Sequence, residues 1–511
     1  MISGELFGAL AAILAPHVFV YLVAGVVLGL IVGALPGLTA TMAMIILLPV
    51  TYSLPTLESI QILMGVFIAG ITAGSITAIA IGIPGTPASA ATVLDGHKLT
   101  LMGRSGEAIC LMFLLNLIGN LLGAVVCILI APQLATFALK FGPPEYALLA
   151  LIGMSLVISL SSKSLLKGLT SGAIGMAVAL VGVDPMTGGA RFNMGVADLA
   201  GGIGYGAVMI GLFGLAEVVS AFGAKQSDAV IASRKADVES ASLTHLRRAA
   251  VHLWPLRWTI LRSAPMGIFI GALPGLGSDI AAWLGYDMSK RFAKKPEEFG
   301  NGSVEGLAGC EVAKSAEDGG AIIPTVTFGI PGDSQTVVIL GALMLHGVRP
   351  GPLLFEQQSL VVWSIFAALL VAPFVTAVFG LLTVRPTVWL VSRPTHFLYP
   401  AVVLFCIVGA FAYSNTVFDV WMMLAFGALG FGMKLVGYPI VPLVLTYILT
   451  PLMESEFRRG LMLVHNNPVE FFTRPVFVIL LIVGVLAFVS ASNVFSRVSG
   501  KRLGIQGKGL K

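Results

Sequence analysis

The sequence predicts an all-α polytopic membrane protein made of two homologous halves in inverted orientation, with broken helices or re-entrant hairpins. Hydrophobic residues make up 57% of the 511 residues and charged residues only 11%, with a mean hydropathy of +0.96. Soluble domains carry about 25% charged residues. At roughly 20 residues per span, the apolar stretches allow about ten to twelve crossings or re-entrant segments.

Two apolar motifs that are broken by glycine and proline each occur twice. The motif GALPGL at 33–38 recurs at 271–276, and the motif GIPG at 82–85 recurs at 329–332. Two different motifs repeated in the same order, 238 and 247 residues later, indicate a duplicated unit. Interrupted apolar segments at matching places in two halves are the best sequence indication of a transporter's binding site.

Charge and hydropathy divide the chain into four parts. These are a first transmembrane repeat (1–221), a basic cytoplasmic linker (222–262), a second transmembrane repeat (263–495) and a cytoplasmic tail (496–511). Within the linker, the stretch from His245 to Trp258 fits either an amphipathic helix in the headgroup plane or a solvated connection.

In chain order, the apolar stretches predict the following segments. The first half has a broken run at 17–50, followed by spans near 60–82, 107–132, 146–160, 165–182 and 203–221. The second half has a broken run at 263–285 and the stretch 300–352, followed by spans near 358–383, 397–413, 418–433, 436–452 and 475–493, with a polar loop at 454–459. The run at 17–50 fits one interrupted span or a hairpin. Basic residues on both sides of 263–285 favour a hairpin with its tip at 271–275. The matching run in the first half is almost uncharged on both sides, which is what an inverted repeat would give.

Several function classes lack the motifs they need. The sequence contains no GxxxxGK[ST] for ATP, no HExxH and no CxxC, and the seven histidines are scattered. The net charge of +5 comes from loops and predicts membrane topology, with no nucleic-acid partner. We therefore expect no enzyme, no cofactor and no zinc site. The four distant cysteines are expected to be buried apolar residues.

The GIPG breaks predict a binding site for an anion. Helix N-termini direct free N–H groups and a positive dipole end at negative charge. The predicted substrate-binding residues follow the two breaks and are Gly85, Thr86, Ser89, Gly332, Asp333, Ser334, Gln335 and Thr336, with Lys314 as a counter-charge. Alternatively, the prolines only kink helices, the hydroxyls bond back to the preceding turn, and Lys314 forms an interfacial ion pair with Glu311.

The other pair of breaks predicts a site for a coupling cation, either H⁺ or Na⁺. Intramembrane carboxylates are costly and usually functional, which directs attention to Asp279 and Asp333. The remaining members of this predicted site are Thr39, Pro36, Pro274 and Ser278, with the carbonyls of Leu35 and Leu273 as possible Na⁺ ligands. A carboxylate beside an anionic substrate would repel it unless it is protonated or paired with a cation.

The combined motifs resemble the large permease subunit of tripartite tricarboxylate transporters, the TctA family. The resemblance extends over nearly the whole chain and includes GALPG, GIPGT with Asp95-Gly96 downstream, GPPE at 142–145, and Gly341-Ala342-Leu343. It implies a multi-pass protein of the bacterial inner membrane that imports carboxylates with a small integral membrane subunit and a periplasmic substrate-binding protein. The sequence departs from the family pattern at Lys314 and Asp333, and we hypothesise that these two residues form a compensating pair.

The sequence therefore predicts a secondary transporter, driven by an ion gradient, that imports a di- or tricarboxylate. Two alternatives from other classes stay open. An intramembrane enzyme acting on a lipid-linked substrate would need a reactive pair beyond Asp279, Asp333 and Lys314. A passive anion channel would show flux without saturation or coupling to a gradient.

Overall fold

The computed structural model of the chain describes residues 2–35, 39–160, 164–184, 186–223, 242–391, 398–414, 416–486 and 488. Helices dominate these residues, and the strands among them are β1 (Gly182–Val183) and β2 (Ala190–Arg191), which pair antiparallel. The predicted all-helical architecture is therefore confirmed. Pro36, part of the predicted linker and the predicted tail at 496–511 lie outside the described residues.

Most of the α-helices fall on the predicted apolar stretches, whereas α1 precedes the first of them and α13 lies in the predicted linker. The first series is α1 (Ile2–Leu14), α2 (Pro16–Ala34), α3 (Ala40–Tyr52), α4 (Thr56–Ile81), α5 (Ala90–Thr92), α6 (Lys98–Leu101), α7 (Ser105–Ala138), α8 (Pro143–Leu160), α9 (Leu165–Ala179), α10 (Tyr205–Met209) and α11 (Ala216–Gly223). The second series is α13 (Leu243–Leu253), α14 (Arg257–Gly271), α15 (Gly277–Phe292), α16 (Val304–Phe328), α17 (Ser334–Leu345), α18 (Leu354–Gln357), α19 (Ser359–Val391), α20 (Leu398–Ser414), α21 (Val417–Val436) and α22 (Ile440–Leu463). Short 3-10 or π turns are η1 (Pro87–Ser89), η2 (Val93–His97), η3 (Ala197–Gly201), η4 (Ile210–Leu215), η6 (Pro296–Glu298) and η8 (Pro468–Thr473).

The protein is a multi-pass membrane protein by the length and composition of its helices. Six helices are long and apolar enough to cross a bilayer: Pro16–Ala34, Thr56–Ile81, Ser105–Ala138, Ser359–Trp389, Val417–Val436 and Ile440–Leu463. Shorter apolar helices include Ala40–Tyr52, Ser334–Leu345 and Pro475–Leu486. The apolar segments counted from the sequence therefore divide into full-length helices and shorter ones, of which Ala40–Tyr52 and Ser334–Leu345 begin at the breaks.

Helix α16 is the buried centre of the fold. All of its residues from Gly306 to Thr327 are buried, and α7, α14 and α15 pack along it. Gly267 on α14 and Gly285 on α15 both lie against Ala313, because a Cβ at either glycine would meet atoms of that residue. The two helices therefore run side by side and turn at 272–276, which confirms the hairpin predicted for 263–285.

The helices of the first broken run have different neighbours. Helix α2 packs along α4, whereas α3 contacts α17 and α20 as well as α4. Glycine again permits the close approach of α2 and α4, since a Cβ at Gly25 would overlap the carbonyl oxygen of Ile62. All four cysteines are buried and none forms a disulfide.

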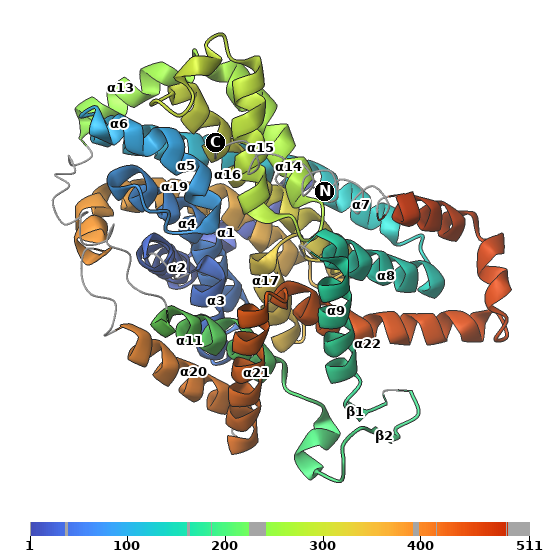
Figure 1. The fold of residues 1–511 in the computed structure, drawn as a ribbon. Helices are drawn as coiled ribbons and strands as arrows, with labels where there is room; N and C mark the ends of the chain where they lie inside the picture. Colours follow the sequence, from blue (N-terminus) through green and yellow to red (C-terminus); the bar gives the residue numbers. More distant parts are fainter. Residues whose placement is uncertain are drawn as a thin grey trace, which may run out of the picture.

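The predicted amphipathic helix before the second half is present as α13. Ala249 is buried against the body of the protein, and His252 Nε2 lies 2.8 Å from Glu107 Oε1 on α7. Trp254 and Trp258 beyond its end are exposed, and the Arg257 guanidinium lies 4.7 Å from the centre of the Trp254 ring. Figure 1 places α13 and the β1–β2 hairpin at opposite ends of the molecule.

The prediction of a polar loop at 454–459 is wrong, because these residues belong to helix α22, which extends to Leu463. Ion pairs along the helix explain the difference: Arg458 Nη2 lies 2.7 Å from Glu454 Oε1, and Arg459 Nη1 lies 2.8 Å from Glu456 Oε1. Charged pairs at spacings of three and four residues stabilise a helix that extends beyond its apolar part.

Candidate functional site

The four breaks converge on one cavity of about 330 Å³. Each break contributes polar lining residues, which are Thr39 and Thr41 after the first, Thr86 after the second, Ser278 and Asp279 after the third, and Asp333, Ser334 and Gln335 after the fourth. Thr41 Oγ1 lies 3.2 Å from Ser334 Oγ, so a hydroxyl contact connects the first break to the fourth across 293 residues of sequence.

The second break is built by a glycine end cap and a polar turn. Helix α4 ends at Gly82, whose φ of 71° is in the left-handed region that favours glycine. The Gly85 N–H then donates to the Gly74 carbonyl at 3.1 Å, which returns the chain toward α4. Thr86 and Ser89 form a capping box at the start of η1, and the Thr86 N–H donates to Ser89 Oγ at 3.3 Å.

The fourth break has the same construction. Helix α16 ends at Gly329, whose φ is 69°, and Asp333 begins α17 as its N-cap. The Thr336 N–H donates to Asp333 Oδ1 at 2.7 Å, and the Asp333 N–H donates to Thr336 Oγ1 at 3.0 Å. The carboxylate of Asp333 therefore has a structural role in addition to its place on the cavity wall.

Glycines hold the breaks together in two pairs. A Cβ at Gly85 would meet the carbonyl oxygen of Gly33, and a Cβ at Gly332 would meet the carbonyl oxygen of Gly271. The Gly275 N–H also donates to the Gly332 carbonyl at 2.7 Å. The first break thus packs on the second, and the third packs on the fourth, at distances that only glycine permits.

The predicted site residues fall into three groups. Those that line the cavity are Thr39, Thr86, Ser278, Asp279, Asp333, Ser334 and Gln335. The second group does not line the cavity, although several of its members hold the breaks in shape; it consists of Leu35, Gly85, Ser89, Leu273, Pro274, Gly332 and Thr336. Pro36 is outside the described residues, and Lys314 lies elsewhere.

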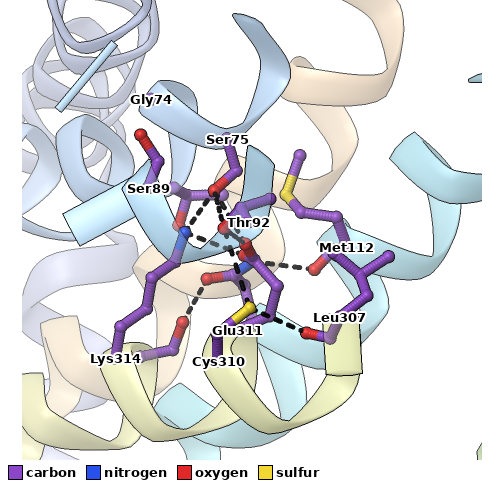
Figure 2. Close-up of polar contacts among 12 residues, drawn as sticks. Gly74, Ser75, Ser89, Thr92, Met112, Leu307, Cys310, Glu311 and Lys314 are labelled. Carbon is purple, nitrogen blue, oxygen red and sulfur yellow. Dashed lines mark hydrogen bonds and ion pairs between the residues drawn. The ribbon is translucent and has the colours of Figure 1, made fainter. Parts of the chain in front are cut away.

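Lys314 belongs to a buried polar network beside the cavity (Figure 2). Its Nζ lies 2.8 Å from Glu311 Oε2 and donates to Ser75 Oγ of α4. Glu311 also accepts from Ser75 Oγ at 2.8 Å, from Asn116 Nδ2 of α7 at 2.6 Å, and from the Thr92 hydroxyl.

This network bears on two hypotheses about Lys314. The predicted ion pair with Glu311 is confirmed, and both side chains have no exposed surface. The ammonium group is directed to Glu311 and Ser75, and charge compensation between Lys314 and Asp333 stays a hypothesis. The spacing of three residues on one helix face explains why the nearer carboxylate is the partner.

Glu317 and Asp318 follow the network by one turn of α16 and were not assigned a role from the sequence. Their side chains are 0% and 1% exposed, and all four carboxyl oxygens lack a hydrogen-bond partner within the described part of the chain. Glu317 interacts electrostatically with Asp279 and Asp333, which line the cavity, so Glu317 lies close to the cavity. Their charge was visible in the sequence, but their isolation was not.

A further carboxylate anchors the first half to the loop before α16. Asp95 Oδ1 accepts from the N–H groups of Gly300, Gly302 and Ser303, each at 2.8 Å. Asp95 Oδ2 accepts from the Tyr286 hydroxyl at 2.9 Å. The residue is 1% exposed, and its role is to position the start of α16.

The cavity is polar and carries negative charge. Asp279 and Asp333 are its ionisable lining residues, and no basic side chain lines it in the described ranges. Asp279 is exposed and lines the cavity. The N-termini of α3, α15 and α17 supply N–H groups and positive dipole ends to the same space.

The chain matches known proteins over nearly its whole length. Residues 19–445 match the model of the "Tripartite tricarboxylate transporter TctA family". The chain is 33% identical over 478 residues to the "Uncharacterized 52.8 kDa protein in TAR-I ttuC' 3'region" of Agrobacterium vitis, covering 94% of each chain. It is also 33% identical over 225 residues to the "Uncharacterized protein in TAR-II ttuC' 3'region" of the same organism, covering 44% of this chain and 93% of the relative. No solved structure gives a significant match.

Proposed function

This chain belongs to the tripartite tricarboxylate transporter TctA family, whose members are large permease subunits and not enzymes, and on that premise we propose that it imports a di- or tricarboxylate driven by an ion gradient. A small integral membrane subunit and a periplasmic substrate-binding protein work with it in a bacterial inner membrane. The observation that carries the proposal is the convergence of four broken segments on one polar cavity.

The chemistry of the cavity fits a small carboxylate. Its volume of about 330 Å³ is at the lower end of the roughly 300–1,000 Å³ of small-molecule sites. Thr86, Ser334 and Gln335 offer hydroxyl and amide donors beside the N-terminus of α17. Gly85, Ser89, Gly332 and Thr336 support substrate binding indirectly by fixing the shape of the two breaks.

The carboxylates of the cavity supply the reason for ion coupling. Asp279 and Asp333 would repel an anionic substrate, so substrate and a neutralising H⁺ or Na⁺ enter favourably only together. Thr39 and Ser278 line the same cavity and offer additional oxygens for a cation. The carbonyls at Leu35 and Leu273 remain the proposed backbone contribution.

The two halves, 1–221 and 263–495, are proposed to be homologous and inverted, and to move against each other for alternating access. Matching contacts support the homology. Gly29 approaches Val66 as Gly267 approaches Ala313, and the same offsets of 238 and 247 residues relate these pairs. The basic linker at 222–262 would connect the halves on the cytoplasmic side.

The enzyme alternative finds no support in the cavity. An intramembrane enzyme needs a nucleophile with an adjacent base, and the described lining offers only the carboxylates Asp279 and Asp333 among its ionisable groups. A passive channel is separated from a transporter by kinetics, since only the transporter saturates and couples to a gradient.

Uptake of labelled citrate and smaller carboxylates into proteoliposomes tests the proposal. The small subunit and the binding protein would be included, and Na⁺ and pH gradients imposed separately. Saturable uptake that depends on one gradient is expected. Folded protein that takes up no carboxylate under either gradient would contradict the proposed substrate class.

A further inference from the structure

We propose that Glu317 and Asp318 are proton-binding groups, which hold protons in the packed arrangement that the structure describes and release them to water when the helices around them rearrange during transport. The inference rests on the proposed transport function and adds a second set of ionisable groups behind the cavity wall. The step is simple and balanced, because each carboxylate takes one proton to become a neutral carboxylic acid and later returns it to water.

The first argument is isolation. An ionised carboxylate in the protein interior is stabilised by hydrogen bonds or a counter-ion, and its burial without them is far more costly than burial of the neutral acid. Glu317 and Asp318 are buried, and none of their four oxygens has a hydrogen-bond partner in the part of the chain that the structure describes. In contrast, both oxygens of the buried carboxylates Glu311 and Asp95 accept hydrogen bonds.

The second argument is the charge around the pair. The Glu317 carboxyl interacts electrostatically with Asp318, Asp279 and Asp333, and the Asp318 carboxyl with Asp333 and Lys314. Around α16, Glu311 pairs with Lys314, Asp95 of η2 accepts from Tyr286 and loop N–H groups, and Glu107 of α7 lies beside Arg104 and His252. On α14 and α15, Arg262 lies over the Phe292 ring, Asp287 pairs with Arg291, and Lys290 is exposed. Among the described residues, the cation that interacts with the two carboxyls is Lys314, which Glu311 already holds.

The third argument selects a proton over a metal ion. Hard cations need several oxygen ligands around one point, whereas neighbouring residues on an α-helix point about 100° apart. No group of three His, Cys, Asp or Glu side chains suited to a metal is found among the described residues. A proton needs one oxygen, so each carboxyl can bind one independently.

The location connects proton binding to the cavity. The Glu317 side chain lies beside Gly271 at the tip of the α14–α15 hairpin, because a Cβ at Gly271 would be 3.1 Å from Glu317 Cγ. Gly275 of this tip lines the cavity together with Asp279 and Asp333. Protonation of Glu317 and Asp318 removes negative charge that faces both residues and thereby favours entry of an anionic substrate.

Infrared spectroscopy of the full-length protein in lipid tests the protonation state without transport. At neutral pH the protein is expected to show the C=O band of a carboxylic acid without hydrogen bonds, shifted in D₂O. The band should weaken in Glu317→Gln and in Asp318→Asn, and should be unchanged in Glu297→Gln, which alters an exposed acid of η6. If the two variants lose intensity from the bands of ionised carboxylates, and the C=O band is unchanged, the proposal is overturned.

Transport supplies an independent readout. With a pH gradient, Glu317→Gln and Asp318→Asn are expected to lose about tenfold or more of net carboxylate uptake while substrate exchange across the membrane continues, which also shows that the variants fold. Net uptake that keeps its full dependence on the pH gradient in both variants would overturn the assignment. If the native protein shows the infrared band but transports no carboxylate, the proton site stands and the proposed function fails.

Discussion

Lys314 Nζ lies 2.8 Å from Glu311 Oε2, and neither side chain has any exposed surface. Burial of an ion pair costs so much desolvation energy that apolar residues of the same size often stabilise a fold better. The pair is therefore weak evidence for stability. Its partners Ser75, Thr92 and Asn116 come from three other segments, so it fixes the position of α16 relative to α4, α5 and α7.

Removal of one member of this pair should be more harmful than removal of both. We expect Lys314→Met to destabilise the protein by about 3–5 kcal/mol, because Glu311 would remain buried as an unpaired charge. The double variant Lys314→Met with Glu311→Gln should recover a large part of the loss. Thermal unfolding of the native protein, Lys314→Met, Glu311→Gln and the double variant in the same detergent measures the coupling between the two residues. Additive losses of stability in the two single variants would contradict the arrangement in Figure 2.

Two substitutions of Asp333 can separate its role as the N-cap of α17 from the role of its negative charge. Asp333→Asn keeps an N-cap side chain for the Thr336 N–H and should leave thermal stability nearly unchanged. Asp333→Ala removes the cap and should cost about 0.5–2 kcal/mol.

Carboxylate uptake should respond differently, with Asp333→Asn losing gradient dependence despite normal stability. Equal uptake by Asp333→Asn and the native protein would show that the residue is only a cap.

The glycine contacts between breaks should tolerate no side chain. Gly85→Ala and Gly332→Ala each place a Cβ against a backbone carbonyl, of Gly33 and Gly271 respectively. Because backbone cannot move aside as a side chain can, uptake should fall about tenfold or more or the protein should lose stability. Gly432→Ala on α21 is the matched control, since a Cβ there meets nothing within 4 Å. A fully active Gly85→Ala protein would mean that the first two breaks are not closely packed.

The sequence predicted the breaks because glycine and proline act locally, and it predicted the hairpin tip at 271–275 because basic residues mark the ends of that segment. It could not reveal the partners of the Lys314–Glu311 pair, because Ser75 reaches Lys314 and Asn116 reaches Glu311 only through the register of helices that lie about 200 residues apart in sequence. The isolation of Glu317 and Asp318 was hidden for the same reason, since a missing partner is a property of the packed structure. Of the two roles that the sequence left open for Lys314, the structure shows the pair with Glu311, and a role toward substrate stays a prediction.

The loop that carries the β1–β2 hairpin should give the protein a dependence on acid pH. Asp184 Oδ1 accepts from the Met186 N–H at 2.9 Å, and Asp184 Oδ2 lies 2.7 Å from Arg458 Nη1. The backbone N–H of Met186, followed by the Arg458 guanidinium, holds the pKa of the Asp184 carboxyl below its ordinary value of 3.8. A carboxyl whose pKa is lowered by folding contributes stability above its unfolded pKa and loses this contribution as pH falls through the folded value.

Thermal unfolding measured at successive pH values checks this expectation. The native protein should lose melting temperature as pH falls below 3.8, as Asp184 becomes protonated and its contacts with Met186 and Arg458 weaken. Asp184→Asn should be less stable than the native protein at neutral pH and should converge with it in acid, because the variant has no charge left to lose. Glu356→Gln on α18, which changes an exposed acid far along the chain, serves as the control. Parallel curves for Asp184→Asn and the native protein down to the lowest pH would contradict the role assigned to this carboxylate.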